Sequence, residues 1–223
     1  MKIKTLMITI AAAMLLAACS KSNDTTVNAT DFSQYYIAGH YSQDLSPTLT
    51  NIPVPYAIIF KSSSKCAFVD AVFGVNNGSY TYANGHLVMN FTNNLVANFD
   101  FTMANNQITT VSADGLGLLT YNLEKIPATN AFINGEYTGT VTSPGTVALA
   151  YVAFSANQYS IGLSGYKTPN MAYTLQNNAV ATAVLNENSS VFVYDNGAVM
   201  MLNYIPPAVV NGPSDYQYGT LTK

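Results

Sequence analysis

The sequence contains no arginine and no tryptophan, and only 9% of its 223 residues are charged. Arginine is the side chain best suited to bidentate recognition of phosphates and nucleic-acid bases, because its planar guanidinium presents donors in a fixed fork. The positive charges are eight lysines and the net charge is −3, without a basic patch or an acidic tail. We therefore expect no binding of nucleic acid.

Residues that carry acid–base or metal chemistry are also scarce. The only histidines are His40 and His86, which together with one thiol make a weak set of zinc ligands. No serine lies in a Gly-x-Ser-x-Gly elbow, and the sequence places no two carboxylates for glycoside hydrolysis. We expect surface positions for both histidines and no catalytic residue, metal site or cofactor. A hydrolase with a dispersed active site is the least favoured alternative.

The residues that are abundant favour strands and tight turns. There are 16 tyrosines and 10 phenylalanines, together with many threonines, valines and asparagines. Aromatic and β-branched side chains fit a pleated, half-buried surface, and asparagine with glycine supplies turns. At 49% hydrophobic residues the chain buries enough surface to offset its ordering entropy. The composition thus predicts an ordered all-β protein.

The N-terminus has the pattern of an export signal. Lys2 and Lys4 precede an uncharged, mainly apolar run over residues 6–18. This run is too short to span a bilayer as a helix, but it suits the core of a signal peptide. It ends in the sequence LAAC, residues 16–19, which resembles the lipobox of bacterial lipoproteins. An ordinary secretory peptide and an uncleaved helix are the alternatives.

The lipobox resemblance implies an address. In lipoproteins the signal peptide, here 1–18, is removed, and the cysteine, here Cys19, receives a diacylglyceryl group and usually a further acyl chain such as palmitate. Several acyl chains anchor a protein stably where one would be marginal. Residues 19–33 are polar and aperiodic, so we interpret them as a flexible tether. Ser20 in place of aspartate resembles the Gram-negative signal for release to the outer membrane. We expect a lipid-anchored protein of the cell envelope.

Cysteine chemistry follows from this anchor. If Cys19 is acylated, Cys66 is the only thiol left, and an intramolecular disulfide cannot form. Cys66 begins the strand-like run CAFVDAVF. We interpret it as a buried, inert thiol, with a reactive thiol as the alternative.

The sequence repeats itself once. YIAGHYSQD at 36–44 resembles FINGEYTGT at 132–140, and four further matches follow in the same order. A period of this length predicts a duplicated domain, with copy 1 at 34–127 and copy 2 at 128–223. The other matched segments are 54–64 with 147–157, 79–88 with 172–180, 98–108 with 191–199, and 120–125 with 218–223. This alignment pairs Gly39 with Gly135, Tyr41 with Tyr137, Phe60 with Phe154, Tyr80 with Tyr173, Phe99 with Phe192, and Phe101 with Tyr194.

Each copy reads as an antiparallel meander of about seven or eight strands. Residues 95–103 alternate between apolar and polar side chains, which is typical of a strand with one wet face. Turns are predicted at Asn77-Gly78, Asn84-Gly85 and Asn196-Gly197, because Asn-Gly adopts positive φ at low cost. A meander leaves two unpaired edges unless it closes into a barrel. Two open β-sandwiches are the alternative.

A second resemblance favours barrels. Gly39-x-Tyr41 and Gly135-x-Tyr137 resemble the Gly-x-Trp that opens the first strand of lipocalin-type (calycin) barrels. In that family the aromatic closes the barrel floor against a basic side chain of the last strand. By this analogy Tyr41 packs with Lys125 and Tyr137 with Lys223, a cation–π contact of about 0.5–1 kcal/mol at an exposed site.

For function, the pattern favours contact over catalysis. Copy 2 is apolar on both strand faces at 147–154 and 198–202, and such strands need cover from the other copy, a partner protein or the membrane surface. Tyrosines are rigid contact groups that need no charge. We therefore expect a lipid-anchored binding or adaptor protein that contacts an envelope partner or a glycan. A lipocalin-like carrier of a small apolar ligand is the alternative.

Overall fold

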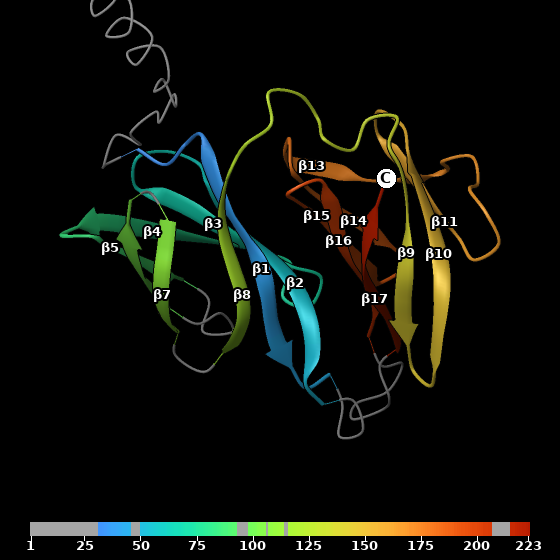
Figure 1. Cartoon of the computed structure of the whole chain (residues 1–223), viewed down its shortest axis with the longest axis horizontal. Helices are drawn as coiled ribbons and strands as arrows, with labels where there is room; N and C mark the ends of the chain where they lie inside the picture. Colours follow the sequence, from blue (N-terminus) through green and yellow to red (C-terminus); the bar gives the residue numbers. More distant parts are fainter. Residues whose placement is uncertain (1–30, 46–49, 93–97, 106, 114–115, 207–214) are drawn as a thin grey trace, which may run out of the picture.

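The computed structural model describes residues 31–45, 50–92, 98–105, 107–113, 116–206 and 215–223. Within these ranges the chain forms antiparallel strands and no helix, so none of the described segments is a helix that could cross a bilayer. Figure 1 shows two barrel-like units side by side, the first coloured blue to green and the second yellow to red. The prediction of an all-β protein with two tandem units is confirmed.

Copy 1 is a meander closed by its two end strands. Consecutive strands pair from β1 to β7, and β1 also pairs with the last strand, β8, which gives the order β7-β6-β5-β4-β3-β2-β1-β8. The sheet is open only between β7 and β8 among the described residues. The strands are β1 Tyr35–Gln43, β2 Ile52–Phe60, β3 Lys65–Val69, β4 Val75–Ala83, β5 His86–Phe91, β6 Phe99–Ala104, β7 Gln107–Ala113 and β8 Gly117–Lys125.

Copy 2 is also a meander whose first and last strands pair, but its sheet is open between β12 and β13. Its first strand β9 pairs with its last strand β17, and the order is β12-β11-β10-β9-β17-β16-β15-β14-β13. The two ends of this sheet, β12 and β13, are separated by Tyr173 alone, so the barrel is nearly closed. The strands are β9 Glu136–Ser143, β10 Thr146–Phe154, β11 Gln158–Gly162, β12 Met171–Ala172, β13 Thr174–Asn177, β14 Val180–Leu185, β15 Asn188–Asp195, β16 Ala198–Ile205 and β17 Asp215–Thr222.

Two of the three predicted Asn-Gly turns join hairpins. Asn84-Gly85 connects β4 to β5 and Asn196-Gly197 connects β15 to β16, and all four residues have positive φ. The turn predicted at Asn77-Gly78 is wrong, because this dipeptide lies inside β4. Gly78 is needed there for space: a Cβ atom would lie 2.6 Å from the carbonyl oxygen of Asn90 on β5.

The same aromatic triad fills one end of each barrel, and we call this end the floor. In each copy a phenylalanine just before the first strand packs on the last phenylalanine of the second strand, and both contact a tyrosine of the fourth strand or its equivalent. The first two rings are 5.2 Å apart in copy 1 and 5.1 Å apart in copy 2. The triads are Phe32, Phe60 and Tyr80 in copy 1, and Phe132, Phe154 and Tyr173 in copy 2. The predicted pairs Phe60–Phe154 and Tyr80–Tyr173 are therefore equivalent in space.

The predicted alignment of the first strands is wrong by four residues. Gly135 precedes β9, whereas Gly39 lies in the middle of β1. The counterpart of Gly39 is Gly139. A Cβ atom on Gly39 would lie 2.1 Å from the Thr120 carbonyl oxygen of β8, and one on Gly139 would lie 2.4 Å from the Thr220 carbonyl oxygen of β17. In both copies, then, glycine permits close pairing of the first and last strands.

The two copies share a hydrophobic core. The outer faces of β1 to β3 pack against the outer faces of β15 and β16, so that these strands are apolar on both sides. Hydrogen bonds cross the same interface: the Tyr36 hydroxyl donates to the Tyr194 carbonyl at 2.5 Å, and the Asn178 amide donates to the Pro127 carbonyl at 2.9 Å. The buried outer-face residues are Tyr36, Ala57, Ile59 and Val69 in copy 1, and Val191, Val193, Met200 and Leu202 in copy 2. Copy 1 thus provides the cover that the apolar run 198–202 requires, whereas Val147 and Leu149 of the other run, 147–154, are exposed.

Truncation of this interface tests whether the copies fold as one unit. Leu202→Ala should lower the free energy of unfolding by about 2–5 kcal/mol, because it removes buried methyl groups and leaves a cavity. Urea unfolding followed by tyrosine fluorescence and circular dichroism should show a single transition at lower urea. Val184→Ala, at a position 77% exposed on β14, should change stability by less than about 0.5 kcal/mol. Two separate transitions would show that the copies fold independently.

Candidate functional site

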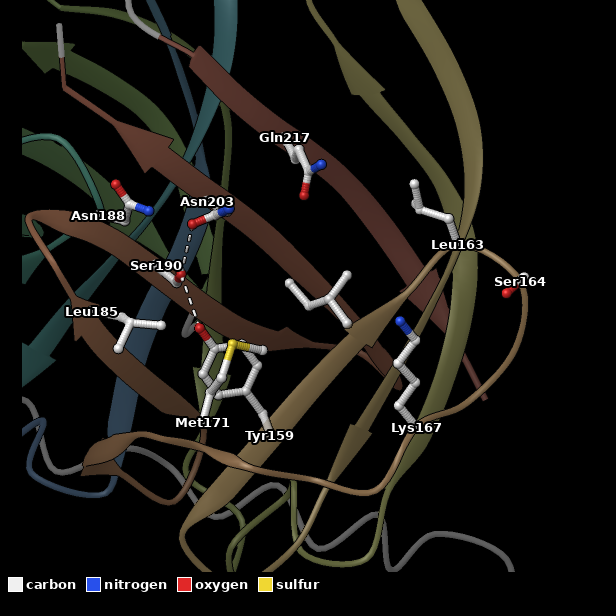
Figure 2. Close-up of a pocket in the computed structure, with 11 residues that line it drawn as sticks. Tyr159, Leu163, Ser164, Lys167, Met171, Leu185, Asn188, Ser190, Asn203 and Gln217 are labelled. Atoms are coloured by element: carbon white, nitrogen blue, oxygen red, sulfur yellow. Dashed lines mark hydrogen bonds between the residues drawn. The ribbon is translucent and has the colours of Figure 1, made fainter. Parts of the chain in front are cut away.

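Opposite the floor of copy 2, the barrel mouth contains a cavity of about 440 Å³. Strands β11, β12 and β14 to β17 contribute to its wall, together with the connection between β11 and β12. Figure 2 shows side chains from these segments on opposite sides of one space. The lining residues are Tyr159, Ile161, Leu163, Ser164, Lys167, Met171, Leu185, Asn188, Ser190, Asn203 and Gln217.

The cavity lies in the half of the barrel where smaller side chains stand in place of a stack of aromatic rings. In the mouth half of copy 1 the rings of Tyr56, Phe68 and Phe99 lie nearly parallel, with Tyr56 and Phe68 5.5 Å apart and Phe68 and Phe99 5.9 Å apart. All three side chains are fully buried. The equivalent positions in copy 2 are Ala150, Ile161 and Ser190.

Strand register establishes these equivalences. Tyr56 pairs with Gly39, and Ala150 pairs with its counterpart Gly139. Phe68 lies two residues after the partner of Phe60 on β3, and Ile161 lies two residues after the partner of Phe154 on β11.

The third equivalence corrects the predicted alignment. The Met103 amide donates to the Gly85 carbonyl in the turn between β4 and β5. The Tyr194 amide donates to the Ala179 carbonyl in the turn between β13 and β14. Met103 therefore corresponds to Tyr194, two positions earlier Phe101 corresponds to Phe192, and Phe99 corresponds to Ser190. The predicted pairs Phe99–Phe192 and Phe101–Tyr194 are therefore wrong by two residues, which is the distance between successive inward-facing side chains of a strand.

The mouth of copy 1 is also closed by a buried carboxylate. The Tyr41 hydroxyl donates to Asp70 Oδ2 at 2.5 Å, and Asp70 Oδ1 accepts from the Phe73 amide at 2.6 Å and the Gly74 amide at 3.2 Å. Burial raises the pKa of Asp70 to about 6, although these hydrogen bonds favour the ionised form. In copy 2 the corresponding connection is longer, and the Ser160 hydroxyl ties it back by donating to the Lys167 carbonyl at 2.6 Å.

The cavity wall in copy 2 combines polar and apolar groups. The Tyr159 hydroxyl lies 3.4 Å from Ser190 Oγ, which donates to Asn203 Oδ1 at 3.1 Å. Burial raises the pKa of Tyr159, so the phenol stays neutral. Ile161, Met171, Leu163 and Leu185 supply apolar surface, and Lys167 is the one charged residue among the described lining residues. This wall suits a ligand that has both hydrogen-bonding and apolar parts.

The residues proposed to close the barrels behave differently in the two copies. Lys223 Nζ lies 5.6 Å from the centroid of the Tyr137 ring. The proposed contact of Tyr41 with Lys125 is wrong, because Lys125 pairs with Tyr35 at the opposite end of β1 and the Tyr41 hydroxyl bonds to Asp70. Cys19 and the LAAC segment lie outside the described residues.

The two histidines occupy outer positions. His86 is exposed, and its Nδ1 lies 3.0 Å from Asp100 Oδ1. His40 is half-buried on the outer face of β1, where its Nδ1 lies 3.2 Å from Thr120 Oγ1. Burial lowers the pKa of His40, and the nearby charge of Asp195 opposes this shift. Within the described part of the chain no three His, Cys, Asp or Glu residues gather as a metal site.

Cys66 is a free thiol with 1% of its surface exposed. Burial raises its pKa to about 12, against the opposing charges of Lys61 and Lys65. Because the thiolate is the nucleophile, this environment makes the thiol inert at neutral pH, as the sequence predicted.

Comparisons with models of known protein families, with curated protein sequences and with solved structures found no match.

Titration of Asp70 should make the first barrel less stable as pH rises. The unfolded carboxyl has a pKa near 3.8 and the folded one about 6, so the folded state holds more protons between these values. Its contribution to stability is therefore full below about pH 4 and is lost as pH rises through about 6, a change of about 3 kcal/mol. Urea unfolding at pH 4 and pH 7 should show this loss in the wild type and not in Asp70→Asn. Parallel pH dependence in the two proteins would contradict the raised pKa.

Thiol labelling tests the environment of Cys66. In a Cys19→Ser protein, where Cys66 is the only thiol, a disulfide reagent at pH 8 should react only after unfolding, because burial protects the thiol and keeps it protonated. The labelling rate should rise across the urea transition. Complete labelling of the folded protein within minutes would contradict the buried position.

Proposed function

We propose that this chain is a lipid-anchored, non-catalytic binding protein of the cell envelope that holds a small ligand in the mouth of its second barrel. Copy 1 serves as a solid scaffold. The LAAC pattern at residues 16–19 supports the anchor and the location.

One observation carries the binding proposal. Tyr56 and Phe99 fill the mouth half of copy 1, whereas Ala150 and Ser190 stand at the same positions in copy 2. Deleting aromatic side chains from a core costs about 3–5 kcal/mol each, so a sequence that only had to fold would gain by keeping them. A bound ligand compensates for such a loss, because its contacts replace those of the missing rings.

The cavity also indicates the kind of ligand. Its volume of about 440 Å³ is at the smaller end of the range for small-molecule sites. The hydroxyl and amide groups of Tyr159, Ser190 and Asn203 would fix a polar group of the ligand. Ile161 and Met171 would contact an apolar part. We therefore propose a compact ligand with one apolar part and one neutral or acidic polar part, the latter within reach of Lys167.

Filling the cavity tests the proposal. Ser190→Phe restores the copy 1 residue at this position and should abolish uptake of anilinonaphthalene sulfonate, an apolar probe with an acidic group, measured by fluorescence titration. Native mass spectrometry of the wild type after incubation with host-cell extract should show a discrete added mass that Ser190→Phe lacks. Val184→Phe adds the same ring on the outer face of β14 and should leave both results unchanged. Equal probe binding by all three proteins would refute a ligand site in the mouth.

A second candidate is an adaptor that docks through the rim of this mouth. Leu163 is 57% exposed and Leu185 50%, and both line the cavity. Exposed apolar side chains gathered at one place are typical of contact surfaces. In that case Leu163→Ser with Leu185→Ser should abolish capture of an envelope protein, and Ser190→Phe should leave capture intact although it abolishes probe uptake, because it fills the cavity without changing the exposed rim.

A further inference from the structure

A second hollow lies between the two barrels. It has a volume of about 380 Å³ and is bounded by β1, β2 and β8 of copy 1 and by β9 and β17 of copy 2. All of these except β2 are the first and last strands that close each barrel. We call this hollow the junction groove. It is separate from the barrel mouth, because the two share no lining residue.

Equivalent positions of the two copies face each other across the junction groove. Because Gly39 corresponds to Gly139, His40 corresponds to Thr140, and Thr120 corresponds to Thr220. The predicted match of 120–125 with 218–223 is therefore wrong by two residues. The histidine and the three threonines all line the groove. The duplication has thus brought the same outer-face positions of both barrels to one place.

The copy 2 side of the groove carries a ladder of hydroxyl groups. Thr142 pairs with Tyr218, and Thr140 and Thr220 lie between this pair and the pair Thr138–Thr222. Alternate residues of a strand share a face, so these side chains all point outwards. Within the described part of the chain, no hydrogen bond engages the hydroxyls of Thr140, Thr142, Thr220 or Tyr218.

The copy 1 side adds further polar atoms without charge. The Thr120 hydroxyl accepts from the His40 amide at 2.9 Å and lies 3.2 Å from His40 Nδ1. Pro53 adds an apolar side chain, and none of the described lining residues is Asp, Glu or Lys. The Tyr218 ring is held flat against Tyr216, with centroids 5.7 Å apart and planes at 26°. A groove with free hydroxyls, one flat ring and no formal charge recognises a partner that is itself neutral and rich in hydroxyl groups.

We propose that the junction groove is a binding site for a neutral saccharide. Threonine and tyrosine hydroxyls both donate and accept hydrogen bonds, so they can pair with sugar hydroxyls either as donors or as acceptors. The Tyr218 ring offers a rigid amphipathic surface for the apolar face of a sugar ring. The site requires both copies, and it accounts for threonines that neither the barrel cores nor the interface between the copies needs.

Titration with named saccharides tests this site. Maltotriose, cellotriose and the trimer of N-acetylglucosamine are added separately, up to about 10 mM, to the ¹⁵N-labelled full chain with Cys19→Ser. At least one should shift the amide signals of Thr140, Gly219 and Thr220. Thr220→Val keeps the shape of the side chain and its strand propensity, and should weaken that binding about three- to tenfold by removing one hydrogen bond. The affinity should be unchanged between low and high salt, because no charge takes part.

Control variants decide where the saccharide binds. Thr222→Val makes the same change on β17, two residues beyond the groove, and should bind like the wild type. Ser190→Phe fills the barrel mouth and should also bind like the wild type. If Ser190→Phe abolishes saccharide binding and Thr220→Val does not, the sugar occupies the mouth and the junction groove proposal is overturned. If none of the three saccharides shifts the groove signals, the proposal is likewise overturned, whereas the mouth proposal is unaffected.

Discussion

The pairing of the first strand of each copy with its last strand determines the rest of this structure. It closes the β1–β8 and β9–β17 ends of the two meanders and leaves little free edge. It requires glycine at positions 39 and 139, because the neighbouring carbonyl oxygen would collide with any Cβ atom. It also gives every strand an inner and an outer face. The inner faces enclose the aromatic floors, and the outer faces carry the shared interface between the copies and the threonines beside Gly139 and Gly219.

Duplication followed by unequal filling explains how one fold holds two kinds of interior. Both copies keep the floor triad, which fixes the entry of the chain into the first strand. Above the floor they diverge: copy 1 stacks Tyr56 and Phe99 and seals its mouth with Asp70, whereas copy 2 has Ala150 and Ser190. A packed barrel and a hollow one thus share a backbone plan, as expected when interior side-chain volume decides whether a small barrel encloses a cavity.

Much of the fold could be predicted from the sequence. Residue composition indicated the fold class, and order-preserving matches revealed the repeat. Asn84-Gly85 and Asn196-Gly197 marked hairpins, because positive φ is a local property. Register could not be read in the same way. Short aromatic motifs recur at several offsets, so Gly135 was aligned with Gly39, although only the close approach of Thr220 identifies Gly139 as the counterpart.

The candidate site was harder to predict, because it is recognised only by comparing the side chains at equivalent positions of the two copies. Ser190 can be identified as a site residue only from the strand pairing, which places it where copy 1 has Phe99. Likewise, Tyr41 was assigned to Lys125 by analogy, and neither residue indicates that Asp70, a carboxylate in the connection between β3 and β4, accepts the Tyr41 hydroxyl. The apolar run 198–202 of copy 2 did indicate a covered surface, whereas the run 147–154 leaves Val147 and Leu149 exposed. The partner of the run 198–202, the outer face of β2, follows only from the tertiary structure.

The shared interface also has a consequence for the order of events during synthesis. The chain is made from its N-terminus, so copy 1 can close its barrel while β15 and β16 do not yet exist. At about 5–20 residues per second, the roughly hundred residues of copy 2 take several seconds or longer to appear. Throughout that interval the outer face with Tyr36, Ala57 and Ile59 lacks its cover. A chain in this state presents an apolar outer face of its first barrel to its surroundings until β15 and β16 cover it.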